Sequence, residues 1–299
     1  MRRTKTVGGD LHCHTKLSDG SLGIEDLIAL AKRCGVDTIA IADHDCLAGT
    51  VRGRIIGERL GVRVIPGVEL SAVDSTTGKR AHILGYLSEF PDRLEGLCHR
   101  NSLARKKAAH YMMLQIAKRF PVSTEFIVKC ATGSTNIFPV HMMQALMECG
   151  CTDSLYGELY HRLFDPGVPG SIYVAPKFPD AAEVIDAVHA AGGIAVLAHP
   201  VLDDNLDALP RLLEHGLDGI EVWHPSADEE TSAALKKLAA KHKLLMLGGT
   251  DFRGLYNTSR VRVGDVATPD DALQKLLGYK ARQKRLAKKA QKAASESAG

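Results

Sequence analysis

Over positions 1–88, short runs of apolar residues alternate with stretches in which apolar side chains recur at helical spacing. The apolar runs predict buried strands at 7–12, 36–42, 62–68 and 81–86. Amphipathic spacing predicts helices over 24–31 and 47–60, and Gly35 ends the first of them. A strand–helix alternation of this kind is typical of βαβ units, which build a parallel sheet.

The same alternation returns after residue 177. Further strands are predicted at 194–198, 219–223 and 244–249. Further helices are predicted at 181–191, 206–215, 228–242 and 269–277. About seven strands alternating with helices predict an α/β protein with a distorted (βα)7 parallel barrel. We assign residues 1–88 and 178–279 to this barrel.

Residues 89–177 interrupt the pattern with a segment that has no strand signal. Three helices are predicted within it, at 103–120, 139–149 and 155–164. Because the strand pattern resumes afterwards, we interpret 89–177 as a helical subdomain inserted into the barrel. Such an insertion is expected to overhang the mouth of the barrel as a lid.

Composition narrows the class of protein. The chain has 299 residues, 45% of them hydrophobic and 24% charged, which is typical of a soluble globular protein. It has no apolar run of about 18 residues, so no membrane span is predicted, and Met1–Lys5 lacks the apolar stretch of a signal peptide. The seven cysteines are scattered and odd in number, which favours free thiols in the cytoplasm. The close pair Cys149 and Cys151 is interpreted as packing.

The basic charge is concentrated at the C-terminus. Residues 280–299 hold seven Lys or Arg and one Glu, a net +6, which leaves −3 for residues 1–279 out of the total of +3. Such a run is usually a solvated helix or a disordered end. A nucleic-acid contact is the alternative, but it is not favoured because no aromatic residues interleave with the basic ones.

A His-x-His pair opens the candidate chemistry. On a strand, His12 and His14 project from the same face and can reach one point, and Asp19 follows five residues later. Two imidazoles and a carboxylate form a donor set that suits a first-row metal. Taken alone, the pair could equally be packed or solvated.

The rest of the chain favours the metal. Six residues of the kinds that bind metals stand at the carboxyl ends of predicted strands, and His82 stands at the start of one. These six are His12, His44, Glu69, His199, His224 and Asp251. In a parallel barrel the strand ends converge on one mouth, where active sites are built. Several histidines with carboxylates suit Mn, Fe or Zn, and a bridging Glu69 would allow a two-ion centre for phosphoester or amide hydrolysis.

The segments that carry these residues resemble a known family. DLHCHTKLSDGS, IAIADHDCLAG, GVELSA, AHILGY, AVLAHP, IEVWHPS and GGTDFRG resemble the polymerase and histidinol phosphatase (PHP) family, within the amidohydrolase-like barrels. The resemblance runs from about residue 8 to 255. It is nearer to the small stand-alone metal-dependent phosphoesterases than to the polymerase-associated domains.

The resemblance implies a role for each ligand. One metal would be held by His12, His14, Glu69 and Asp251. A second would be held by Glu69, His82 and His199. Many members bind a third metal through an aspartate, a histidine and a closing histidine. Asp19 and His44 match the first two positions of that set, but Arg253 stands at the third.

Arg253 changes the expected metal count. A guanidinium cannot ligate a cation, and it carries its own charge. It could occupy the third position, pair with Asp19 and present N–H donors to a phosphate oxygen. We therefore predict two divalent ions, with Mn favoured over Fe or Zn. In the alternative, Arg253 points outward and Asp19 and His44 hold a third metal weakly.

The mechanism implied by the resemblance is attack on phosphorus by a hydroxide that bridges the two metals. Catalytic roles are assigned to Asp251, His224 and Arg253, with His224 protonating the leaving alcohol, although it could equally be a packed histidine. Substrate-binding candidates in or beside the insertion are Arg105, His141 and Lys177. Each of these three could instead be a solvated residue.

The substrate is expected to be a small phosphorylated metabolite. Because one arginine supplies less charge than a third metal, a singly charged diester is favoured. The first choice is the cyclic phosphodiester of phosphoribosyl 1,2-cyclic phosphate, followed by phosphate release. The alternatives are a 3′-phosphatase of nucleoside 3′,5′-bisphosphates, an oligonucleotide-trimming hydrolase, a nucleic-acid-associated PHP module and an amidohydrolase of C–N bonds. The sequence does not indicate an oligomeric state.

Overall fold

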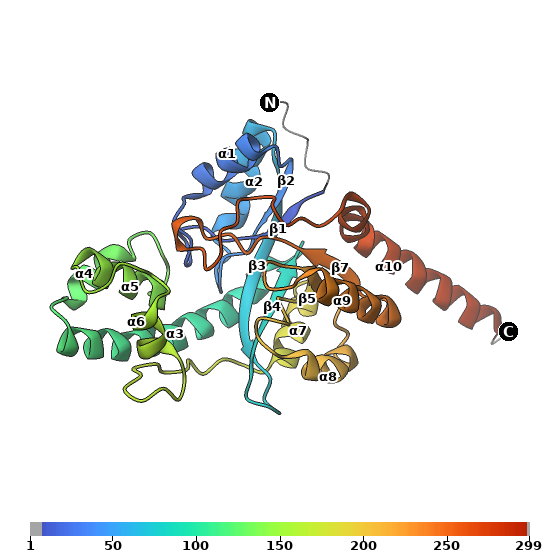
Figure 1. Ribbon diagram of the computed structural model, residues 1–299. Helices are drawn as coiled ribbons and strands as arrows, with labels where there is room; N and C mark the ends of the chain where they lie inside the picture. The colour runs from blue at the N-terminus through green and yellow to red at the C-terminus, as the bar shows by residue number, and fades with distance from the viewer. Residues whose placement is uncertain (1–7, 298–299) are drawn as a thin grey trace.

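A computed structural model describes residues 8–297 (Figure 1). Seven strands form one curled sheet in which the spatial order follows the chain. The strands are β1 (Asp10–Cys13), β2 (Thr38–Ile41), β3 (Arg63–Val73), β4 (Arg80–Tyr86), β5 (Ile194–Leu197), β6 (Gly219–Trp223) and β7 (Leu245–Gly248). The predicted α/β barrel class and its seven strands are confirmed. Val7, at the start of the predicted first strand, lies outside the described residues.

One strand runs against the expected direction. The β1–β2, β2–β3, β5–β6 and β6–β7 pairs are parallel, whereas β4 is antiparallel to both β3 and β5. The prediction of a wholly parallel barrel was wrong at this strand. Residues 74–79 are all that join β3 to β4, and a parallel crossover needs a dozen residues or more. The start of β4 therefore lies at the same edge of the sheet as the ends of its neighbours.

Alternation along the strands supplies two cores. In β2, Ile39 faces the helices α1 (Ile24–Cys34) and α2 (Gly49–Leu60), while Ala40 faces the inside of the curl with Tyr86. Over the later strands the same outer face is covered by α7 (Ala181–Ala190), α8 (Leu209–Glu214), α9 (Glu229–His242) and the short η2 (Leu206–Ala208), whereas Val196 of β5 faces the inside of the curl. Burial on both faces explains why the strands read as continuous apolar runs.

The inserted segment has a hydrophobic cluster of its own. It contains η1 (Pro91–Leu94), α3 (Glu95–Arg119), α4 (Thr124–Cys130), α5 (Pro139–Glu148) and α6 (Glu158–Phe164). Met112 and Ile116 of α3 pack in this cluster, whereas Leu97 and Cys98 at the start of α3 pack against the sheet. A single long helix thus joins the two cores, and α4 to α6 lie to one side of the sheet (Figure 1). The short helix α4 has only two turns and was not predicted.

The C-terminal part is more helical than expected. After η3 (Gly254–Tyr256), α10 runs from Asp270 to Ser297, well beyond the predicted end at residue 277. Leu273 and Leu276 of α10 are buried against the sheet, and the helix then projects away from the body (Figure 1). Residues 298–299 of the predicted tail lie outside the described residues. Within the described part, no helix is long and apolar enough to cross a membrane.

Candidate metal centre

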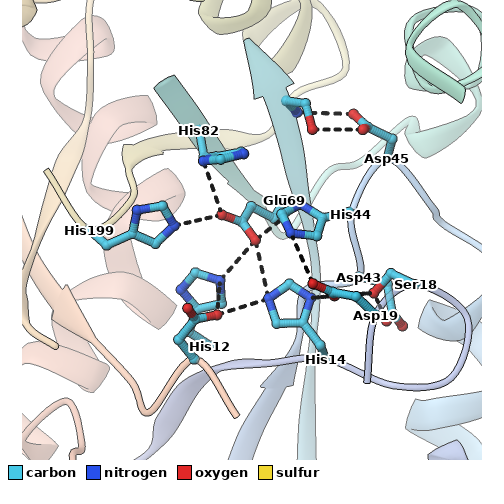
Figure 2. Close-up of polar contacts among 12 residues, drawn as sticks. His12, His14, Ser18, Asp19, Asp43, His44, Asp45, Glu69, His82 and His199 are labelled. Atoms are coloured by element: carbon cyan, nitrogen blue, oxygen red, sulfur yellow. Dashed lines mark hydrogen bonds and ion pairs between the residues drawn. The ribbon is translucent and has the colours of Figure 1, made fainter. Parts of the chain in front are cut away.

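Glu69 lies at the centre of a ring of imidazoles at the carboxyl edge of the sheet (Figure 2). Its Oε2 is 3.1 Å from His12 Nε2, 3.1 Å from His14 Nε2 and 3.3 Å from His44 Nδ1. Its Oε1 is 2.9 Å from His199 Nε2 and 3.8 Å from His82 Nδ1. The two oxygens of one carboxylate therefore serve two separate sets of histidines.

The strands explain why these side chains meet. His12 of β1 and His14, one residue beyond it, both reach Glu69 Oε2, although the register of β1 shifts and Leu11 and Cys13 pack in different cores. His82 reaches the same edge because β4 is antiparallel to its neighbours. His199 and Asp251 follow β5 and β7 with positive φ of 21° and 51°, a region that non-glycine residues seldom occupy. Strained backbone of this kind clusters at functional sites.

A bridge across the open side of the curl brings Asp251 to the histidines. Phe252 pairs with Cys13 of β1, and its carbonyl accepts a hydrogen bond from His14 N–H at 2.8 Å. Asp251 Oδ1 then lies 3.4 Å from His12 Nε2 and 3.1 Å from His14 Nε2. The four predicted ligands His12, His14, Glu69 and Asp251 thus offer donor atoms within 4.8 Å of one another.

The donor atoms fit divalent metals. Several ligand-type atoms are buried and have no hydrogen-bond partner among the described residues, including His14 Nε2, His44 Nδ1 and Asp251 Oδ1. Buried polar atoms are rarely left without a partner unless an ion or water satisfies them. Three further groups have metal-binding spacing, namely His14–Asp19–His44, His44–Glu69–His82 and His82–His199–Asp203. Imidazole and carboxylate donors suit Mn, Fe and Zn.

Charge pairing keeps the central carboxylates ionised. Burial by itself raises the pKa of Glu69, but the surrounding imidazoles, His44 first, hold the pKa well below its usual range. Burial also raises the pKa of Asp251, and Arg253 and then His12 outweigh it, so that this pKa too is well below the usual range. Both side chains are therefore available as anionic ligands at neutral pH.

Two buried carboxylates that the sequence analysis did not select support the histidines. Glu221 of β6 lies 3.1 and 3.2 Å from His12 Nδ1 and accepts a hydrogen bond from His199 N–H at 2.8 Å. Asp203 Oδ2 lies 2.9 Å from His82 Nδ1 and 3.3 Å from His199 Nδ1. A carboxylate behind a histidine fixes the tautomer and orientation of the ring toward a metal. A charged residue inside the apolar run 219–223 was the available signal for Glu221.

Asp43 and Asp45 hold the loop that carries His44. Asp43 accepts hydrogen bonds from Thr15 N–H at 2.7 Å and Ser18 O–H at 2.6 Å. Asp45 accepts from Ser71 N–H at 3.0 Å and Ser71 O–H at 2.8 Å (Figure 2). His44 is thereby fixed between the loop after β1 and strand β3.

Arg253 lies where the resemblance placed a third metal. Its Nε donates to Asp19 Oδ2 at 2.8 Å, and its Nη1 lies 2.5 Å from Asp251 Oδ2. The ion pair expected between Arg253 and Asp19 is thus present. Arg253 Nη2 also lies 3.4 Å from His44 Nε2. Against the effect of burial, Arg253 and then His44 keep the pKa of Asp19 below its usual range.

His224 lies beside the cluster. Its Nε2 is 3.6 Å from Asp251 Oδ2, and its Nδ1 accepts a hydrogen bond from Ser226 N–H at 3.1 Å. In the neutral ring the proton is therefore on Nε2, which is buried and has no hydrogen-bond partner within residues 8–297. This arrangement directs an N–H donor toward the metal ligands.

The three substrate-binding candidates occupy different environments. Arg105 donates to Asp45 at 3.0 Å and Ser71 at 2.6 Å, and its guanidinium lies over the Phe138 ring at 4.6 Å. His141 is buried, and Lys177 is exposed and forms no ion pair within the described part of the chain. The structure does not gather these three side chains at a common point as it does the metal ligands.

Comparison with known proteins agrees with this centre. Residues 10–131 match the PHP domain family. The chain is 36% identical to phosphoribosyl 1,2-cyclic phosphate 1,2-diphosphodiesterase of Eggerthella lenta over 83% of this chain and 94% of the relative. It is 33% identical to 5′-3′ exoribonuclease Rnm of Escherichia coli over 81% of this chain and 84% of the relative. A solved structure from Bifidobacterium adolescentis, classed as a metal-dependent phosphoesterase, superposes with a TM-score of 0.82 at 28% identity and covers 91% of this chain and 96% of that one.

Fold, donor set and these likenesses together define a metal-dependent phosphoesterase. The chain belongs to the PHP family, as the motifs around His12, His44 and Asp251 predicted. The hydrolase class and the need for metal are thereby confirmed.

Proposed function

We propose that this enzyme hydrolyses a small cyclic phosphodiester, phosphoribosyl 1,2-cyclic phosphate, and then releases phosphate from the product. The observation that carries the proposal is the guanidinium of Arg253, 2.8 Å from Asp19 and 2.5 Å from Asp251. One fixed positive charge at this position matches the single negative charge of a diester better than the two charges of a monoester. The likeness to the diphosphodiesterase of Eggerthella lenta supports the same choice.

We propose two metal ions, held by the ligands that share Glu69. His12, His14, Glu69 and Asp251 form the first set, and Glu69, His82 and His199 form the second. Bound divalent ions, with Mn favoured over Fe or Zn, would activate water and neutralise the phosphoryl oxygens. A third ion at Asp19 and His44 is not part of the proposal, because the Arg253 guanidinium lies within 3.4 Å of both side chains.

The protein's own groups have distinct roles in this proposal. Arg253 orients and stabilises the phosphoryl oxygens through its N–H donors. In each hydrolytic step, oxygen from water bonds to phosphorus and one P–O bond to the ribose breaks. The proton that the attacking water loses passes to the departing oxygen, and the Nε2–H of His224 donates a hydrogen bond to that oxygen. Asp251 keeps Arg253 and the histidines of β1 in one geometry.

In this proposal, residues 1–88 and 178–279 form the barrel. The helical insertion, residues 89–177, covers the mouth of the barrel as a lid. Arg105, at 3.0 Å from Asp45, would couple α3 to the His44 loop. Lys177 and His141 are proposed to face the substrate. All seven cysteines are free, which supports a cytoplasmic location.

The test combines metal content per chain with phosphate release from phosphoribosyl 1,2-cyclic phosphate and from adenosine 3′,5′-bisphosphate. Two ions and turnover of the cyclic ester would support the proposal. Three ions with turnover of the bisphosphate would overturn it and indicate a trinuclear 3′-phosphatase. Full turnover by a metal-loaded Asp251→Asn or His199→Ala variant would contradict the assigned residues.

The second candidate is hydrolysis of RNA from its 5′ end, favoured by the 33% identity to exoribonuclease Rnm. A basic α10 that projects from the body is compatible with a contact to a polyanion (Figure 1). Release of mononucleotides from a short 5′-phosphorylated RNA, with no turnover of the cyclic ester, would favour this candidate.

A further inference from the structure

A cleft of about 420 Å³ lies between the loop after β1, the insertion helices and η3. Its volume is within the range of small-molecule sites. The lining includes the charged or polar side chains of Lys16, Ser21, Lys129, His141, Glu148 and Tyr256. None of the proposed metal ligands lines this cleft, so it is a separate space from the metal centre.

The cleft adjoins the metal centre through Arg253. Its wall includes Gly20 and Ser21, which directly follow Asp19 in the chain. Ser21 N–H donates to the carbonyl of Arg253 at 2.9 Å. Tyr256, which also lines the cleft, belongs to the short η3 turn that begins after Arg253. A substrate whose phosphorus lies at Arg253 can therefore extend into the cleft.

The two lysines of the cleft have no acidic partner. Lys16 and Lys129 are exposed, and no ion pair involves either of them within residues 8–297. Glu148, the acidic side chain of the lining, accepts a hydrogen bond from Gln144 at 2.7 Å. Ammonium groups that lack a carboxylate partner are free to bind an anion.

Two neutral donors accompany the lysines. Burial lowers the pKa of His141 to about 4, so the ring is neutral at physiological pH. Its Nδ1 accepts from Phe138 N–H at 3.2 Å, which leaves the proton on Nε2. Ser21 Oγ accepts from Leu255 N–H at 2.7 Å, which leaves its O–H to donate. The cleft thus combines two cations with neutral hydrogen-bond donors.

We propose that this cleft binds a second, non-reacting phosphate of the substrate through Lys16 and Lys129. The ligand class is a phosphomonoester on the sugar that also carries the reacting phosphate. This inference rests on the proposed function, because it assumes that the reacting phosphate lies at Arg253. It adds a specificity site formed by residues outside the metal cluster.

The experiment compares substrate pairs that differ only in the distal phosphate. Phosphoribosyl 1,2-cyclic phosphate is paired with ribose 1,2-cyclic phosphate, and adenosine 3′,5′-bisphosphate with adenosine 3′-monophosphate. Lys16→Ala and Lys129→Ala are each expected to raise KM for the distally phosphorylated member at least about tenfold, the size of one charge-assisted hydrogen bond. KM for the other member and kcat for both are expected to stay within about twofold.

Lys32→Ala serves as the matched control, because Lys32 is an exposed lysine of α1 outside the cleft. Equal losses on both members of a pair, or no loss on either, would overturn the proposal. A phosphate-dependent loss with the nucleotide pair alone would support the cleft and identify its ligand as a nucleotide.

Binding separates this proposal from the proposed function. Calorimetry with ribose 5-phosphate and with adenosine 5′-monophosphate needs no turnover. Weaker binding of either compound to Lys16→Ala/Lys129→Ala than to the wild type would support the cleft even if no cyclic ester were hydrolysed. Unchanged binding of both compounds would overturn it, even if the cyclic ester proved to be the substrate.

Discussion

The metal centre and the neighbouring cleft are built in opposite ways. Around Glu69 the side chains are buried, and the imidazole nitrogens lie within about 4 Å of the carboxylate oxygens. In the cleft, Lys16 and Lys129 are exposed and stand on a loop and a helix rather than on strands. Rigid strand ends hold catalytic groups in a fixed geometry, whereas loops and insertions vary and set specificity. The comparison predicts that the sheet edge carries the chemistry, whereas the loop after β1 and the insertion select the substrate.

The most severe test of the comparison is Glu69→Gln. The amide keeps the shape of the side chain but removes the charge that both sets of histidines share. We expect loss of bound metal and a fall in kcat/KM of at least about 10³-fold, since the activation of water depends on these ions. Metal analysis by mass spectrometry and initial rates measure the two effects. Glu148→Gln, in the cleft, is the matched control and should retain its metals; a metal-loaded, fully active Glu69→Gln enzyme would refute the central role of Glu69.

Arg253→His sharpens the boundary between the two regions. It supplies the imidazole that completes a third ligand set with Asp19 and His44, so the metal content is expected to rise from two to three per chain. Turnover of the cyclic diester should fall about 10- to 100-fold, because a hydrogen-bond donor to the phosphoryl group is lost. Metal stoichiometry and kcat on the diester test this.

Arg253→Lys controls for the loss of the guanidinium, because a lysine keeps the positive charge without adding a metal ligand. It should leave the stoichiometry at two. An unchanged metal content in Arg253→His would show that this position does not decide the number of ions.

Glu221→Gln tests whether the support behind the ligands matters. Glu221 lies 3.1 Å from His12 Nδ1, and removal of its charge should weaken the hold on that ring. Partners of this kind are typically worth 10- to 100-fold in metal affinity. Titration of the chelator-stripped protein with Mn²⁺ measures the change, and Glu183→Gln, at an exposed position on α7, is the control. Equal Mn²⁺ affinity of the Glu221→Gln and Glu183→Gln variants would show that Glu221 does not support the metal ligands.

The smallest effect is expected at a histidine–carboxylate pair far from both regions. The Asp218 carboxylate accepts a hydrogen bond from His189 Nε2–H at 2.9 Å, which raises the pKa of His189. A raised pKa in the folded state means that the pair stabilises the protein below about pH 6.5 and loses this contribution as pH rises through the folded pKa. His189→Gln should therefore lower Tm more at pH 5.5 than at pH 9, with a loss below about 1 kcal/mol because the pair is partly exposed. A larger loss at pH 9 would reverse the assigned sign.

Much of the fold and of the metal centre could be predicted from the chain itself. The His-x-His spacing indicated that His12 and His14 reach one point, and the ends of apolar runs located His44, His199 and Asp251. These inferences succeed because a buried strand imposes a local pattern on the residues that form it. The early start of α3 at Glu95 was missed, since its first turns pack on the sheet and carry no distinct periodic signal.

The direction of β4, the partners of the ligands and the cleft were decided only by the tertiary structure. In a parallel strand, His82 would lie at the opposite edge of the sheet from the other ligands. Because β4 is antiparallel to β3, His82 lies at the same edge as they do. Asp203 and Glu221 act on rings that lie far from them in sequence, as in the 209-residue separation between His12 and Glu221. A local pattern reports which face of an element is buried, but not which distant side chain meets it. Lys16 and Lys129 likewise share a cleft because folding brings a loop and a helix together, and no spacing in the sequence encodes that meeting.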